Sequence, residues 1–300
     1  MRMLFSLLEA SFISSKACVM GIPEKLIFRL FAAPGLLSEK LKYLHKLSNE
    51  ITPPENLRAW GERVLNNKAE SWTRAAWWGL AAGELLRLYL MSPQHREEAV
   101  GLVKKNEWEK YRKNWENKGV VLAAGHVGPP RFAMVAAAQK FNNISIWTDP
   151  VNDKNLTEPR DGLEYLNPAK EDKGAIFLRA ALRLRENGLV LGAVDGKRSD
   201  RPVFIKDFNR VWAFSPGIPM LVRKLGVEAY LTLAVWEGMT IRLVAVPINP
   251  PDPDLPEKEW IDAWIVSYWG LLRKVIMQSP INMRWQLFED PALIRSDMGI

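Results

Sequence analysis

One stretch, residues 119–132, constrains the fold more than any other part of the sequence. It reads GVVLAAGHVGPPRF, a run of small and β-branched residues that breaks at Gly125-His126 and resumes a helical pattern after Pro129-Pro130. Prolines suit the first turn of a helix, where backbone N–H groups have no intrahelical acceptor. The pattern predicts a buried strand, a turn that carries His126, and a helix whose positive dipole end lies near the imidazole.

Strand-like and helical segments alternate along the rest of the chain, which favours parallel strands joined by crossover helices. Strands are expected where short apolar runs are bounded by turn residues: 120–124, 144–148, 189–194, 203–205, 228–235 and 240–246. Helices are expected where apolar residues recur at helical spacing: 55–66, 69–91, 98–118, 130–139, 176–186, 216–224 and 257–278. The expected fold class is α/β, with a mixed, mainly parallel sheet flanked by helices. Ser215 is expected to be the N-cap of the helix at 216–224.

Residues 1–50 are expected to form an α-helical N-terminal segment in front of an α/β domain at 51–300. Charged residues interrupt this segment too often for a run of about 20 apolar residues to span a bilayer. Residues 3–13 and 25–37 are predicted to be amphipathic helices, either in a membrane interface or packed on the domain. The helix at 69–91 is apolar almost all round, which fits a buried or membrane-facing position, and its Trp77-Trp78 pair fits core packing better than a ligand cage.

Composition argues against disulfide-stapled folds and zinc sites. A single cysteine, Cys18, permits no intrachain disulfide, and three histidines leave little for a zinc site, so no metal is expected. Lysine and arginine outnumber acids by 41 to 34, a net charge of +7. This surplus suits an anionic membrane surface, nucleic acid or phosphorylated substrates. Thirteen tryptophans are compatible with a membrane interface, where Trp is enriched.

A second strand end carries a carboxylate. The strand expected at 189–194 delivers Asp195 to its carboxyl end, as the earlier strand delivers His126. The loop that follows, DGKRSDRP, places the cations Lys197, Arg198 and Arg201 close together. Such a cluster suits an anionic group, above all phosphate. A merely solvated basic loop is the alternative.

Basic and aromatic residues are interleaved in the segment 98–118. This pattern is typical of surfaces that bind nucleic acid. The same pattern also fits a solvated helix whose aromatic face packs on the sheet. We favour the second interpretation, and no nucleic-acid partner is expected.

Four blocks of the sequence resemble the lysophospholipid acyltransferase superfamily, closest to its lipid A biosynthesis branch of lauroyl and myristoyl acyltransferases. GVVLAAGHVGPP is similar to that family's strand-His turn, and GAIFLRAALRLRENGLVLGAVDG to its helix-strand-Asp block. VFIKDFNRVWAFSPGIPMLVRKLGV looks like its phenylalanine-containing strand and following helix, and SPINMRW occupies the place of its closing segment. The likeness runs from about Asn56 to Trp285, with the four blocks in the family's order.

The resemblance implies a glycerolipid acyltransferase-like fold and an acyltransferase activity. A fatty acyl chain would pass from an acyl carrier protein or CoA thioester, the donor substrate, to a hydroxyl of a lipid acceptor, without a bound cofactor. His126 would remove the proton from that hydroxyl. The substrate phosphates would be held by basic residues: Arg131, Lys197, Arg198 and Arg201. The protein would lie on the cytoplasmic face of the inner membrane as a peripheral or monotopic protein, with the cytoplasm as the alternative location.

The sequence departs from the family where a carboxylate is expected to orient the histidine. Five residues after His126 stands Arg131, where the family has Glu or Asp. A cation there would destabilise the imidazolium formed during the reaction. Asp195 is the leading candidate to supply the carboxylate instead. If no carboxylate is supplied, the alternative is a catalytically impaired homologue that binds an acyl carrier or lipid as a partner or regulator.

A second departure lies near the end of the chain. After Trp285 the family has a basic pair, whereas this sequence continues to Glu289 and Asp290. The charge inversion here and the one at Arg131 are opposite in sign. We hypothesise that Glu289 or Asp290 pairs with Arg131 in space.

Overall fold

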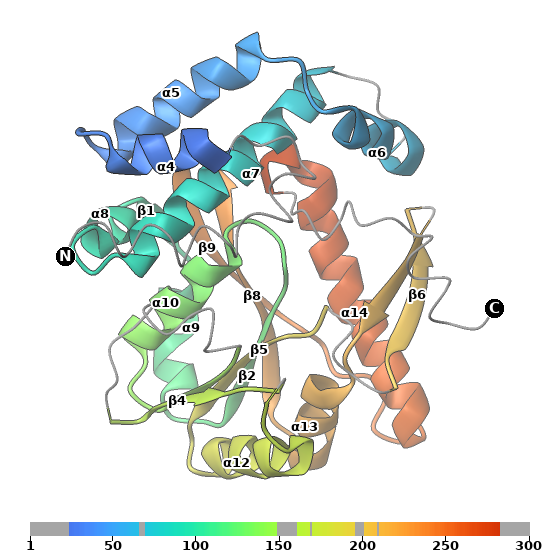
Figure 1. Ribbon diagram of the computed structural model, residues 1–300. Coiled ribbons are helices and arrows are strands. Elements are labelled where there is room, and N and C mark those ends of the chain that lie inside the picture. Colours follow the sequence, from blue (N-terminus) through green and yellow to red (C-terminus); the bar gives the residue numbers. More distant parts are fainter. Residues whose placement is uncertain are drawn as a thin grey trace.

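The computed structural model describes residues 24–65, 70–148, 161–168, 170–195, 201–208 and 210–282. Within these residues a seven-stranded sheet runs through the centre of the molecule (Figure 1). Its strands are β1 (Val103–Asn106), β2 (Val120–Ala124), β3 (Ile144–Trp147), β4 (Leu163–Leu166), β5 (Leu189–Ala193), β8 (Glu228–Glu237) and β9 (Thr240–Pro247). The strands β6 (Val203–Asp207) and β7 (Arg210–Phe214) form a separate antiparallel pair.

Helices flank this sheet, and their bounds follow the predicted apolar periodicity closely in most of the chain. They are α4 (Glu24–Ala32), α5 (Leu37–Glu50), α6 (Glu55–Leu65), α7 (Glu70–Met91), α8 (Arg96–Val100), α9 (Trp108–Trp115), α10 (Pro130–Lys140), α12 (Lys173–Arg185), α13 (Gly217–Leu225) and α14 (Glu257–Gln278), followed by the 3₁₀ turn η1 (Pro280–Asn282).

The sheet is mixed and mainly parallel, in the order β1-β9-β8-β2-β5-β3-β4. From β8 through β4 all neighbouring strands are parallel, whereas β8 and β9 form an antiparallel pair. The predicted α/β class with a mainly parallel sheet flanked by helices is confirmed.

The chain leaves β2 and β5 in opposite directions across the sheet. From β2 it passes through α10 to β3, beyond β5, and from β5 it passes through the β6–β7 pair and α13 to β8, beyond β2. Because crossover connections between parallel strands are right-handed, α10 and α13 cover opposite faces of the sheet. Ligands of open α/β sheets bind at the carboxyl ends of the strands where the order reverses. In this fold that point lies at the ends of β2 and β5.

The helices α4 and α5 pack on α7 at one end of the molecule (Figure 1). The predicted helix 25–37 is shorter than expected, because α4 ends at Ala32 and α5 begins at Leu37. Ile27 of α4 is buried, and the other apolar residues of α4 that pack against the core are Leu26, Phe28, Leu30 and Phe31. These contacts favour packing on the domain for this segment. The other predicted segment, 3–13, and Cys18 lie outside the described residues. The division into parts at residue 50 stays a prediction.

The helix α7 is buried almost all round, as its apolar composition predicts. Trp77 and Trp78 lie in the core, and the Trp78 ring packs edge-on against Trp236 of β8, with 5.3 Å between ring centroids. The interpretation of this pair as core packing is confirmed. None of the helices in the described ranges is both long enough and apolar enough to cross a bilayer.

The prediction of one helix over 98–118 is wrong. The segment contains the end of α8, the strand β1 and the shorter helix α9. Among the described strands β1 lies at the edge of the sheet, where it pairs with β9, and its Lys104 and Lys105 are exposed. An edge strand with charged side chains carries no alternating apolar pattern, so periodicity does not reveal it.

The aromatic residues of α9 face the core. Trp108 and Trp115 are fully buried, and Trp108 donates a hydrogen bond from Nε1 to the carbonyl of Val244 at 2.9 Å. These rings are therefore not available to stack on nucleotide bases, which removes the main support for the nucleic-acid interpretation.

Three smaller differences concern the ends and edges of elements. The sequence pattern predicts neither β4 nor β7. The first is a short, partly buried edge strand, and the second pairs with β6 along its length and with Asp195 through Phe214. The N-cap of α13 is Pro216 rather than Ser215. Ser215 instead continues the extended backbone that follows β7, because its N–H donates to the Val194 carbonyl at 2.8 Å.

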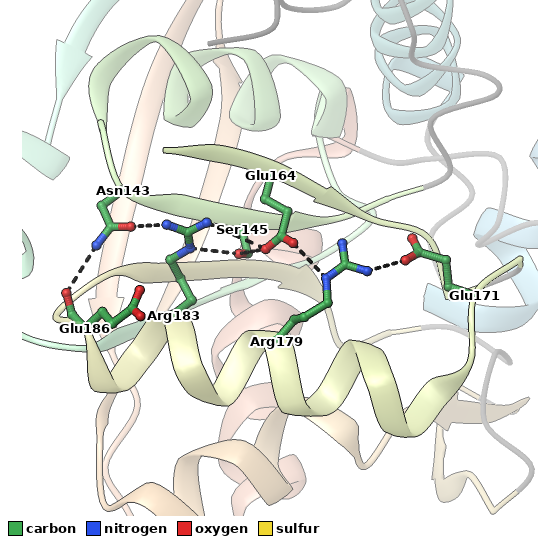
Figure 2. Close-up of polar contacts among 7 residues, drawn as sticks. All are labelled: Asn143, Ser145, Glu164, Glu171, Arg179, Arg183 and Glu186. Atoms are coloured by element: carbon green, nitrogen blue, oxygen red, sulfur yellow. Dashed lines mark hydrogen bonds and ion pairs between the residues drawn. The ribbon is translucent and has the colours of Figure 1, made fainter. Parts of the chain in front are cut away.

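A polar network fixes α12 to the sheet. Figure 2 shows Arg179 and Arg183 of α12 reaching toward Glu164, on the edge strand β4. Arg179 Nε donates to Glu164 at 2.7 Å, and Ser145 of β3 donates to the same carboxylate at 2.8 Å. Arg179 also bonds to Glu171. Since α12 leads directly into β5, this network helps to set the position from which β5 starts.

Candidate active site

The structure brings His126 and Asp195 together at the carboxyl ends of two neighbouring strands. β2 and β5 are parallel and in register, with Ala124 opposite Ala193. His126 and Asp195 each lie two residues beyond this pair of alanines, and thus meet at the same edge of the sheet. Asp195 Oδ1 lies 3.1 Å from His126 Nδ1, and Asp195 Oδ2 accepts the backbone N–H of His126 at 2.8 Å.

The partners of Nδ1 determine where the neutral imidazole carries its proton. Besides the carboxylate, the backbone carbonyl of Asp195 lies 3.1 Å from His126 Nδ1. A carbonyl oxygen only accepts hydrogen bonds, and so does an ionised carboxylate. Nδ1 therefore carries the hydrogen, and Nε2 keeps its lone pair.

Nε2 is the atom of this pair that can act on a substrate. Within the described part of the chain His126 makes no hydrogen bond through Nε2. The His126 side chain is 36% exposed, against 14% for Asp195. A partly exposed ring with a bare Nε2 and a carboxylate behind Nδ1 is the arrangement of a general base.

Two glycines allow the turn after β2 to fit its surroundings. Gly128 has φ +61°, and a Cβ there would lie 2.2 Å from the carbonyl oxygen of Ala234 in β8. A Cβ on Gly125 would lie 2.8 Å from the hydroxyl of Tyr268. The backbone of the turn is thus in close contact with both β8 and α14.

Asn282 holds the turn to the end of β8. Its backbone carbonyl accepts the N–H of Gly128 at 2.8 Å. Its side chain accepts the Trp236 N–H at 2.6 Å and donates to the Trp236 carbonyl at 3.2 Å. Asn282 is buried, so these bonds are shielded from water.

Tyr268 of α14 reaches the end of β2 from the other side. Its hydroxyl donates to the carbonyl of Ala124 at 2.7 Å. Burial, and next the negative charge of Asp195, raises the pKa of the Tyr268 hydroxyl well above its usual value. The hydroxyl thus keeps its proton and stays a donor.

Sequence patterns alone do not mark Asn282 or Tyr268 as site residues. Tyr268 falls on the apolar face of α14 and Asn282 in the turn after it, among the residues 257–282. A tyrosine on an otherwise aliphatic and indole-rich face is the one available signal, because a buried phenol needs a hydrogen-bond partner.

The predicted phosphate-binding residues are only partly described. Arg131 lies in the first turn of α10 and is partly buried, and Arg201 is exposed. Lys197 and Arg198 lie outside the described residues. The same is true of Glu289 and Asp290, so their pairing with Arg131 stays a prediction.

The described residues contain no group of three or more His, Cys, Asp or Glu side chains arranged to hold a metal ion. In comparisons with known proteins, no family model matches this chain, and no curated protein matches it either.

Proposed function

We propose that the protein is an acyltransferase that moves a fatty acyl chain from a thioester to a hydroxyl of a lipid or lipid-like acceptor. The donor would be an acyl carrier protein or CoA thioester. The observation that carries this proposal is the placement of Asp195 against Nδ1 of His126, because it leaves Nε2 as a base beside solvent. The sequence resemblance to the lipid A branch of the lysophospholipid acyltransferase superfamily supports the choice of reaction. With it we propose that the α/β fold is of the glycerolipid acyltransferase-like type.

The reaction needs one proton to move twice. His126 Nε2 takes the proton of the acceptor hydroxyl while its oxygen bonds to the thioester carbonyl carbon. The tetrahedral intermediate collapses with cleavage of the C–S bond, and the imidazolium returns the proton to the leaving sulfur. Asp195 stabilises the imidazolium between these steps and holds the ring in the required tautomer.

Asp195 can supply the carboxylate that is lacking at position 131. In the family that this chain resembles, the carboxylate stands five residues after the histidine, where this chain has Arg131. A carboxylate from the neighbouring strand supplies the same charge to Nδ1. Arg131, at the start of α10, would then serve the phosphate of a substrate together with Lys197, Arg198 and Arg201.

A second candidate function is favoured by Arg131 itself. A guanidinium in the first turn of α10 opposes the positive charge that His126 acquires during the reaction. The protein would then be a catalytically impaired homologue that binds an acyl carrier or a lipid. Both candidates place the protein at the cytoplasmic face of the inner membrane, with a lipid and an acidic or phosphorylated thioester carrier as partners.

The test is acyl transfer by the purified protein from labelled acyl carrier protein and acyl-CoA to a lipid extract, with products identified by mass spectrometry. His126→Ala should lower the rate by about 10²–10⁴-fold, the usual contribution of a general base. His45→Ala, which removes an exposed imidazole on α5, is the matched control and should leave the rate unchanged.

Two outcomes would change this conclusion. Equal rates for the wild type and His126→Ala would rule out the histidine mechanism. No transfer by the folded wild type, together with measurable binding of an acyl-CoA by calorimetry, would favour the impaired homologue.

A further inference from the structure

We propose that Tyr268 is a positioning residue for His126 and Asp195, acting through the carbonyl oxygen of Ala124. The inference concerns the geometry of this pair, and it rests on the proposed function only for its effect on the rate. Tyr268 lies 142 positions after His126 in the chain, and it comes from α14, outside the sheet.

The Ala124 carbonyl joins the two strand ends that carry the pair. It accepts the backbone N–H of Val194 at 3.1 Å and the hydroxyl of Tyr268 at 2.7 Å. Ala124 is the last residue of β2, and Val194 directly precedes Asp195. Both lone pairs of this oxygen are therefore used, one across the sheet and one toward α14. A shift of the carbonyl would move His126 and Asp195 relative to each other.

The space for the hydroxyl exists because residue 125 is a glycine. A Cβ on Gly125 would lie 2.8 Å from the Tyr268 hydroxyl and 2.9 Å from Cδ1 of Leu272. The hydroxyl thus fills the position next to the peptide that links β2 to His126. It restrains that peptide by contact as well as by the hydrogen bond.

The ring of Tyr268 is held independently of its hydroxyl. It stacks on Trp264, with centroids 5.9 Å apart and planes at 7°, and it meets Phe214 edge-on at 6.2 Å. Phe214 forms an isolated antiparallel bridge with Asp195. The ring therefore packs on the residue whose backbone pairs with Asp195. A phenylalanine at position 268 would keep these ring contacts and lose the hydroxyl, with its hydrogen bond to the Ala124 carbonyl and its interaction with Asp195.

The Tyr268→Phe variant isolates the hydroxyl, and Tyr230→Phe is its matched control. Tyr230 is also buried, but its hydroxyl donates to Glu228 at 2.9 Å at the opposite, amino end of β8. Two measurements are made on each full-length protein. One is the ¹⁵N chemical shifts of the imidazoles, which report the tautomer and are tractable because the chain has three histidines. The other is steady-state acyl transfer.

The wild type and the control should show His126 with its hydrogen on Nδ1. In Tyr268→Phe the ¹⁵N shifts of His126 should move toward a mixture of the two tautomers. The value of kcat should fall by about 10- to 100-fold, the range expected for a small misplacement of a reacting group, with KM within about twofold. Loss of the tautomer preference without acyl transfer in any protein would uphold the positioning role and overturn the proposed function alone.

Unchanged ¹⁵N shifts and a kcat within about twofold of wild type in a folded Tyr268→Phe protein would overturn the inference. Equal changes in the Tyr230→Phe control would also overturn it, because the effect would then be a general loss of stability. If Tyr268→Phe fails to fold, Gly125→Ala tests the same contact, since its methyl group would displace the hydroxyl. Wild-type tautomer shifts in that variant would likewise overturn the inference.

Discussion

Both oxygens of the Asp195 carboxylate bond to His126, one to the ring and one to the backbone. The backbone bond, at 2.8 Å, fixes the carboxylate relative to the turn. The ring bond then fixes the imidazole relative to the carboxylate. One carboxylate therefore restrains both the backbone and the ring of His126.

Replacement of Asp195 by asparagine should abolish most of the activity while the fold is kept. The amide oxygen can still accept the His126 N–H, but this leaves the amide NH₂ facing Nδ1 and favours the tautomer with hydrogen on Nε2. In serine proteases the same substitution lowers turnover by about 10⁴. The measurement is kcat in acyl transfer, with Asp172→Asn, at the N-cap of α12, as a control away from the site. A kcat within threefold of wild type would show that Asp195 does not orient the base.

Gly128→Ala should strongly destabilise the fold. The residue has φ +61°, and the new methyl group would lie 2.2 Å from the Ala234 carbonyl. Gly238→Ala is a matched control, because it has the same φ but no atom within 4 Å of the added Cβ. The control should cost about 1–2 kcal/mol for the left-handed backbone alone, and Gly128→Ala at least about 2 kcal/mol more. Urea denaturation measures both, and equal losses would contradict the close packing of the turn on β8.

Asn282→Ala should weaken the hold on the turn that carries His126. The substitution removes both side-chain bonds to Trp236 and leaves its buried N–H without this acceptor. The expected loss is about 1–3 kcal/mol of the free energy of unfolding. Asn117→Ala, which removes an exposed side chain bonded to the Lys113 carbonyl, should change stability by less than about 0.5 kcal/mol. An Asn282→Ala variant with the same free energy of unfolding as wild type would show that the turn is held by other contacts.

The stability of the protein should fall in acid. The pKa of Glu171 is lowered from 4.5, first by the hydrogen bond from the Asn167 N–H and then by Arg179. A carboxylate with a lowered pKa in the folded state stabilises the protein above its unfolded pKa, and this contribution is lost as the pH falls through the folded value. Similar lowering of the pKa applies to other carboxylates: Glu109, Glu228 and Glu237.

Glu171→Gln isolates one of these contributions. The variant should be less stable than wild type by roughly 0.5 kcal/mol at neutral pH, since the group is partly exposed and screened. The difference should shrink below about pH 4.5, the ordinary value for glutamate. Chemical denaturation between neutral and acidic pH gives this difference directly. A difference that stays constant into strong acid would contradict the assigned pKa direction.

The elements that position the site could be predicted from the sequence because their patterns are strong. β2 and β5 are continuous apolar runs buried on both faces, and α14 carries a clear helical stripe. Since both runs end at the same edge of a parallel sheet, a meeting of His126 and Asp195 was a reasonable expectation. Their adjacency depended on the strand order, which short-range patterns do not contain.

The strands and site residues that sequence patterns do not reveal depend on contacts between distant segments. β1 and β4 form because a neighbouring strand offers backbone partners, not because their own side chains alternate. Tyr268 and Asn282 act on a turn more than 140 residues earlier in the chain. No local pattern marks such residues, since their roles arise from tertiary packing.

The in-register pairing of Ala124 with Ala193 also determines where this chain tolerates a change in length. One residue inserted within 120–126 or within 189–195 would move one member of the pair by one position and turn its side chain to the opposite face. Insertions in the connections that precede Val120 and Leu189 would not change the two-residue spacing from the paired alanines to His126 and to Asp195. Homologous or engineered chains that keep the pair should therefore vary in those connections and hold both seven-residue segments constant.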